Sequence, residues 1–85
     1  MTEMTPHAAA EKLRKAAAKW GATAAKEKDA EMAAVYMQDQ AALLIVAARI
    51  AKGEKKRARD KADMLDTIVR EEIPHDVWKW LHDRD

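Results

Sequence analysis

The chain has 85 residues, and its 16 Lys+Arg and 15 Asp+Glu give a formal net charge of +1. It contains no cysteine, which excludes a disulfide scaffold, a cysteine nucleophile and thiolate metal sites. The longest uncharged apolar run, Ala41 to Ala48, is too short to span a membrane, and no N-terminal segment resembles a signal peptide. We therefore expect one cytoplasmic domain.

The composition predicts an all-α fold. Alanine is the commonest residue, and Lys, Glu, Arg, Met and Leu make up half of the remainder; all of these are good helix formers. Apolar residues recur at helical spacing, and no Asn-Gly or Asp-Gly hairpin signal occurs. We expect a small helical bundle with three main helices and a short C-terminal helix.

The first predicted helix covers about 5–28. Thr5 is a competent N-cap, and Pro6 suits the first helical position because its missing amide would be unpaired there anyway. Leu13 and Trp20 are the only large residues of its apolar stripe. Gly21 indicates either a kink or a close approach of another helix.

The second predicted helix covers about 30–52, with Gly53 at its C-terminal end. The segment between the first two helices is polar but compatible with a helix, so one continuous helix is the alternative. We favour a turn, because a single long helix would leave Leu13 and Trp20 without a packing surface.

The third predicted helix covers about 54–72 and ends before Pro74, because a residue that precedes proline is disfavoured in the α region. The last covers about 74–82. His75 and His82 are seven residues apart, about 10 Å along a helix, which is too far for one metal ion. We therefore predict no metal site and no cofactor.

The second helix is apolar nearly all round, which indicates that it is buried nearly all round. It either lies at the centre of a monomeric bundle or packs against a second subunit, and we favour a homodimer. Asp39 lies on an apolar stripe of this helix, so its carboxylate must be paired or solvated. It could fix the register of the two subunits. The predicted dimer interface consists of Tyr36, Asp39, Leu43, Val46 and Ile50.

Basic residues cluster in two segments, and the C-terminal quarter of the chain is acidic. Basic helix faces of this kind can bind the phosphates of a nucleic acid, contact an acidic protein or simply be solvated. Of Trp78 and Trp80, one is expected at the rim of the core and partly exposed, and an exposed Trp is a typical interface anchor. The predicted partner-binding residues are Lys12, Lys15, Lys19, Lys52, Lys55, Lys56, Arg57, Arg59, Trp78 and Trp80.

Nothing in the sequence indicates an enzyme or a small-molecule substrate, since it has no phosphate-binding glycine loop and no Ser or Cys nucleophile. We expect a binding protein that acts through a protein partner. An inhibitor or accessory factor of a host complex, such as a phage-encoded blocker of an immune nuclease, fits this class. The alternatives are a sequence-nonspecific nucleic-acid-binding protein and a self-associating assembly subunit.

Overall fold

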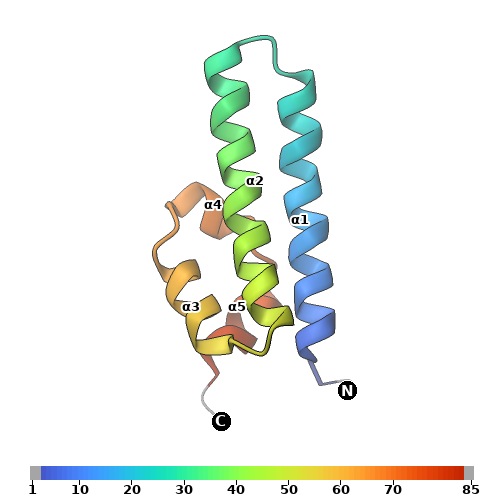
Figure 1. The fold of residues 1–85 in the computed structure, drawn as a ribbon, viewed down its shortest axis with the longest axis vertical. Helices are drawn as coiled ribbons and strands as arrows, with labels where there is room; N and C mark the ends of the chain where they lie inside the picture. The colour runs from blue at the N-terminus through green and yellow to red at the C-terminus, as the bar shows by residue number, and fades with distance from the viewer. Residues whose placement is uncertain (1–2, 84–85) are drawn as a thin grey trace.

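The computed structural model describes residues 3–83 and is all-helical over that range, which confirms the predicted fold class. Two long antiparallel helices form a hairpin, and three short helices pack against its lower half (Figure 1). The helices are α1 (Pro6–Lys26), α2 (Ala30–Ala51), α3 (Lys55–Asp63), α4 (Thr67–Glu71) and α5 (His75–His82).

Helix α1 begins as the sequence predicts. The Oγ1 atom of Thr5 accepts a hydrogen bond from the backbone N–H of Ala8 at 3.1 Å, and Pro6 occupies the first turn. Leu13 is completely buried on the inner face of the helix. The predicted apolar stripe therefore does face the core.

The predicted turn between the first two helices is also confirmed. Asp29 has an extended backbone, and its Oδ1 atom accepts from Glu31 N at 2.9 Å. An aspartate cap holds the N-terminus of α2 because it satisfies amides that have no partner inside the helix. The chain therefore reverses over 27–29, and α2 runs back along α1.

The other end of α2 is closed by Gly53, as predicted. Gly53 has a positive φ of 80°, and its N–H donates to Ile50 O at 3.0 Å. The N–H of Glu54 donates to Arg49 O at 2.8 Å. This pair of bonds is the Schellman motif, and it directs the chain into α3.

The prediction of one helix over 54–72 is wrong. The helix breaks at 64–66 into α3 and α4. Ala58, Ala62, Leu65 and Val69 share one face of a continuous helix, so their spacing could not reveal the break. In the structure the break turns the chain back toward the hairpin, and Leu65 and Val69 remain buried.

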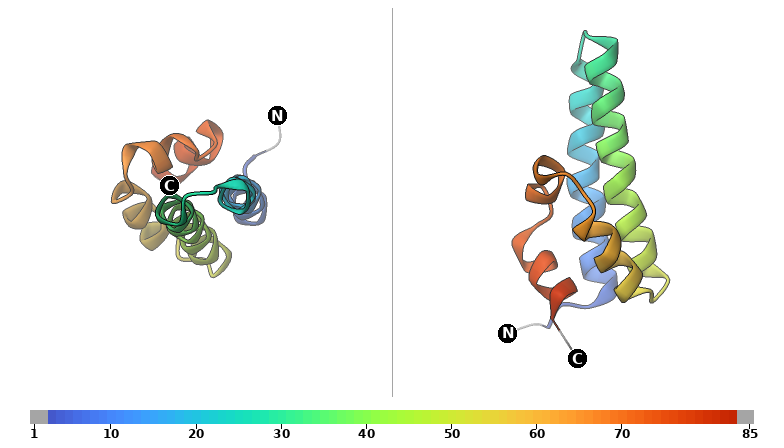
Figure 2. Two further views of the ribbon diagram at one scale, coloured as in Figure 1. Left: turned by 90° about the horizontal axis from the view of Figure 1, so that it is seen from above. Right: turned by 90° about the vertical axis from the view of Figure 1, so that its left-hand side faces the viewer.

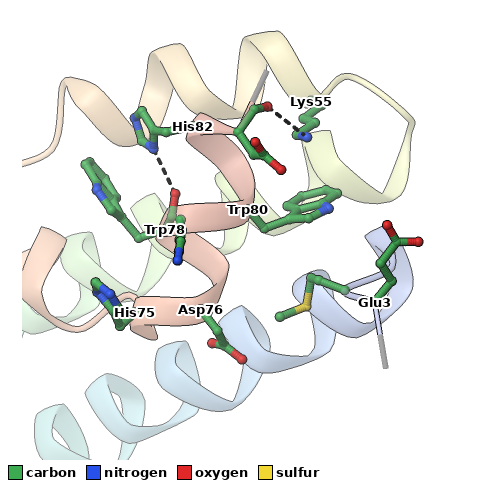
Figure 3. Close-up of a pocket in the computed structure, with 10 residues that line it drawn as sticks. Glu3, Lys55, His75, Asp76, Trp78, Trp80 and His82 are labelled. Carbon is green, nitrogen blue, oxygen red and sulfur yellow. Dashed lines mark hydrogen bonds between the residues drawn. The ribbon is translucent and has the colours of Figure 1, made fainter. Parts of the chain in front are cut away.

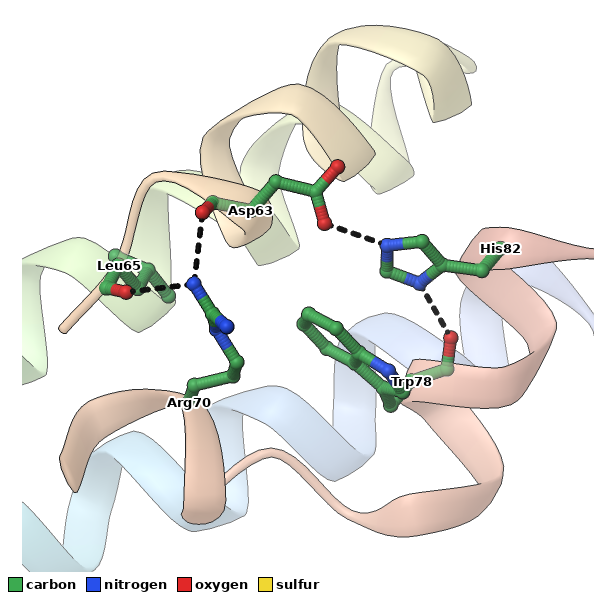
Figure 4. Close-up of polar contacts among 5 residues, drawn as sticks. All are labelled: Asp63, Leu65, Arg70, Trp78 and His82. Carbon is green, nitrogen blue, oxygen red and sulfur yellow. Dashed lines mark hydrogen bonds and ion pairs between the residues drawn. The ribbon is translucent and has the colours of Figure 1, made fainter. Parts of the chain in front are cut away.

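A polar cluster joins the three short helices (Figure 4). Arg70 Nη2 donates to the carbonyl oxygens of Asp63 at 2.8 Å and Leu65 at 3.2 Å, which gives partners to the end of α3. The indole of Trp78 lies between the Arg70 guanidinium, 5.6 Å from the ring centroid, and the His82 ring, whose centroid is 4.2 Å away. His82 Nε2 lies 2.6 Å from Asp63 Oδ1.

The core lies in the lower half of the molecule (Figure 2). The buried residues of α2 begin at Leu43, and the upper half of the hairpin contributes only Ala24. The molecule measures 44 × 24 × 20 Å, and its radius of gyration is 13.0 Å. A compact chain of this length would have a radius of about 12 Å, so the projecting hairpin makes the molecule elongated.

Candidate interaction surfaces

The exposed large hydrophobic residues of the described chain are concentrated on one helix. Isolated exposed apolar residues are normal, but a group of them marks an interaction surface or a ligand-binding groove. Here the group lies mainly on α2, with the remainder in the α3–α4 turn and on α4. The residues are Met32, Val35, Met37, Leu44, Ile45, Met64 and Ile68.

Within one copy of the chain α2 is covered on one face only, and three of the five predicted dimer residues lie in the chain's own core. Leu43, Val46 and Ile50 are at most 1% exposed within the chain's own core, so they are not available to a second subunit. Tyr36 packs against Trp20 of the same chain, with ring centroids 5.6 Å apart. Asp39 is half-buried beside this pair. Helix α1 and the short helices cover one face of α2, and the opposite face is bare.

That opposite face carries an unbroken apolar stripe along the whole helix. Its members are spaced alternately four and three residues apart, which is the heptad pattern of a helix that packs on another helix. Every member is exposed. We call this stripe the α2 seam, and it consists of Ala30, Ala34, Met37, Ala41, Leu44, Ala48 and Ala51.

A second apolar surface lies where the hairpin rises past α4. Here a groove of about 500 Å³ separates the two long helices from the short one. Met32, Val35 and Ile68 are 41%, 45% and 67% exposed. We call it the Trp20 groove, and its lining is Lys19, Trp20, Thr23, Met32, Val35, Tyr36, Asp39, Ile68 and Glu72.

Two polar features mark the Trp20 groove. The indole Nε1 of Trp20 is buried and has no hydrogen-bond partner in the structure. Burial raises the pKa of Asp39 above its ordinary value, and the nearby carboxylate of Asp66 raises it further. A carboxylate in this position is stabilised by an incoming cation.

The predicted basic residues do not form one surface. Helices α1 and α3 lie on different sides of α2 (Figure 2), so the lysines of α1 are separated from the basic residues of α3. Lys12 pairs with Asp76 of α5. Arg57 pairs with Glu54 at 2.8 Å. Lys15, Lys19, Lys52 and Lys56 are exposed, and Arg59 is half-buried.

The predicted Trp pair lines a shallow cleft of about 790 Å³ between α5, the start of α3 and the N-terminal residues (Figure 3). Both Trp78 and Trp80 are half-buried against the core. The Lys55 ammonium lies 4.4 Å from the centroid of the Trp80 ring, a cation–π contact. Lys55 and both indoles therefore contribute to the chain's own packing.

His75 and Asp76 also line this cleft, and His82 lies at its edge. The Nδ1 atom of His82 is 2.9 Å from the carbonyl oxygen of Trp78, and Nε2 faces the Asp63 carboxylate. Because both neighbours accept hydrogen bonds, the ring makes both bonds only as an imidazolium. Among residues 3–83 the structure shows no group of three or more His, Cys, Asp or Glu side chains that could hold a metal ion.

The sequence analysis missed both apolar surfaces, for different reasons. The heptad spacing of the α2 seam is visible in the sequence, but in an alanine-rich helix that is apolar nearly all round it does not single out one exposed face. The Trp20 groove carried no local signal, because Trp20, Val35 and Ile68 come from different helices.

Comparisons with models of known families, with curated proteins and with solved structures give no match to this chain. No helix in the part of the chain that the structure describes is both long and apolar enough to cross a membrane.

Proposed function

We propose that this chain is a non-enzymatic helical binding protein that acts by protein–protein contact. The observation that carries this proposal is the concentration of exposed large hydrophobic side chains on α2 and α4, outside the core. The protein would occupy a surface of a larger complex, as an inhibitor or an accessory factor does. The cytoplasmic location expected from the sequence stays a prediction.

The Trp20 groove is the surface proposed for the protein partner. Its lining is mostly apolar and includes the carboxylates of Asp39 and Glu72. A partner segment with apolar side chains and a neighbouring basic residue complements both features, because the cation would stabilise the Asp39 carboxylate. Such segments dock in helix-lined grooves in many complexes.

Site-specific photo-crosslinking in the cells that make the protein tests this proposal. We expect a photo-reactive amino acid in place of Ile68 to give a discrete adduct with another protein, because this side chain borders the groove. The same label in place of Ala18, which is exposed on α1, is the control. Val35→Glu should abolish the adduct, since it replaces an apolar side chain of the groove lining with a carboxylate.

Equal labelling from both positions, or no adduct with another protein from position 68, would overturn the proposal. Binding of labelled DNA or RNA is measured alongside by fluorescence anisotropy at low and moderate salt. Strongly salt-dependent binding without a protein adduct would support the nucleic-acid alternative, in which Lys12, Lys15 and Lys19 contact phosphates.

A further inference from the structure

We propose that the α2 seam binds the α2 seam of a second copy of this chain, in antiparallel orientation. This inference goes beyond the proposed function, because it names a second partner, on another face of the helix that carries most of the exposed apolar surface. It concerns a different face from the Trp20 groove, and the two contacts can form together.

The first argument is access. The seam lies opposite the buried face of α2, which is formed by Leu43, Val46, Ala47 and Ile50. Among the other helices, α1 and α3 make the main contacts with α2, and every member of the seam is exposed, so the seam is unobstructed along its length. A straight helix of another molecule can therefore lie along it.

The second argument is size complementarity. The seam has alanine at every position except Met37 and Leu44, which are 54% and 42% exposed. In an antiparallel pair whose two-fold axis passes between Ala42 and Leu43, each large side chain faces an alanine. Leu44 then faces Ala41 of the second copy, and Met37 faces Ala48. Such pairing of large with small residues lets two helices approach closely without voids.

A parallel pair lacks this complementarity. It would place Met37 on Met37 and Leu44 on Leu44, and every other layer would hold two alanines. The large layers would hold the helices apart, and the alanine layers would then be cavities. Unfilled cavities in a packed interface are destabilising, so the antiparallel arrangement is favoured.

The third argument is charge. Between Ala30 and Ala51 the only charged side chains are Glu31, Asp39 and Arg49. Glu31 and Lys52 lie on the same edge of the seam at its two ends, three heptads apart. In the antiparallel register, Glu31 of each copy lies beside Lys52 of the other. An acidic and a basic side chain therefore meet at each end of the helix pair. Ile45, on the same edge, becomes partly covered.

The contact is narrow. The seam from Ala34 to Ala51 is about 26 Å long, and one helix pair covers less surface than a standard interface of roughly 1,600 Å². We therefore expect a dimer that forms at micromolar rather than nanomolar concentrations.

Sedimentation equilibrium from micromolar to near-millimolar protein tests the dimer. The mass should rise from one copy to two with concentration, and Ala41→Glu should keep the protein monomeric because it puts a carboxylate in the central layers. The matched control is Ala18→Glu, at an exposed alanine on α1. Circular dichroism should show equal helicity for both variants, as Glu is a good helix former.

Single cysteines test the orientation, since the natural chain has none. A mixture of Ala34→Cys and Ala51→Cys should form the mixed disulfide under mild oxidation, and neither variant alone should form its own. Disulfides within each variant alone would show a parallel pair and overturn the antiparallel arrangement.

A wild-type protein that is monomeric throughout, or a dimer that Ala41→Glu leaves intact, would overturn this inference. Neither result touches the proposed function, because crosslinking from position 68 reports on the other face. Conversely, a dimer that Ala41→Glu dissociates, together with no adduct at position 68, would support the seam and contradict the Trp20 groove.

Discussion

Gly21 and Gly53 are the only glycines of the chain, and they have different roles. A Cβ at Gly21 would lie 2.5 Å from the side-chain Nε2 of Gln40, so the space beside Gly21 on α1 is filled by a side chain of α2. Gly53 has open space around it but a positive φ of 80°, which residues with a Cβ adopt at a cost.

We expect opposite effects from alanine at these two positions. In Gly21→Ala the obstructing atom is the far end of a flexible side chain that can rotate toward solvent, so the gain in helix propensity dominates. The free energy of unfolding should rise by about 0.5 kcal/mol. Gly53→Ala should lower it by about 1 kcal/mol. Urea unfolding measures both, and a destabilised Gly21→Ala would show that Gln40 cannot move.

Because Lys12 pairs with Asp76, we expect the free energy of unfolding to fall slightly in acid. The hydrogen bond from Lys12 lowers the pKa of Asp76 below its ordinary value of 3.8. A lowered pKa in the folded state adds stability above pH 3.8, and this contribution disappears as the pH falls further. Because the side chains are about half exposed, we expect less than about 1 kcal/mol.

The measurement compares the wild type with Asp76→Asn in urea between about pH 2 and pH 7. The variant should be slightly less stable near neutrality, and the difference should vanish at the acid end. Asp39 responds in the opposite direction, but it is present in both proteins. A difference that is independent of pH would contradict this assignment.

At the scale of elements, α2 has two apolar faces with different roles. One face completes the core, and the other is the exposed seam. A sequence pattern that is apolar nearly all round cannot say which of its faces the same chain will cover. The structure decides this, because α1 and α3 both pack against α2, and the face that they bury contains Leu43.

Two adjacent leucines provide the test. Leu43→Ala removes a side chain that is fully buried and should lower the free energy of unfolding by about 2–4 kcal/mol. Leu44→Ala, at the neighbouring and exposed position, should change it by less than about 0.5 kcal/mol at low protein concentration. Thermal or urea unfolding measures both. Equal losses would show that the two faces have been assigned wrongly.

At the scale of the whole molecule, packing is unevenly distributed. The three short helices cover the lower half of the hairpin, and the upper half has little beyond the contact of Trp20 with Tyr36 (Figure 1). Segments with few buried apolar contacts open locally at lower free energy than the core does. The Trp20 groove lies at the boundary between these two halves.

Native-state hydrogen exchange should show this difference in local stability between the upper and lower halves of the hairpin. Backbone amides over 22–38 should exchange through local opening, at least tenfold faster than the slowest amides of 43–50. Glu27→Ala and other changes near the turn should leave the slow amides unaffected. Uniform protection along both long helices would contradict the gradient and would show that the hairpin opens as one unit.

Particular residues show how far the sequence could be interpreted. The start at Thr5-Pro6, the turn near Asp29 and the end at Gly53 rest on local hydrogen bonds or dihedral preferences, and all three were predictable. The break at 64–66 was not, because the residues on both sides share one helical face and only the return of the chain toward the hairpin separates them.

By itself, therefore, the sequence determined the helical class, the reversal that forms the hairpin and the apolar character of α2, since each depends on interactions within a few residues. Only the tertiary structure decided that Leu43, Val46 and Ile50 face inward, that the seam through Ala41 and Leu44 is exposed, and that Trp20 and Ile68 meet in one groove. Burial depends on which distant segments fold back, and no local pattern encodes that choice.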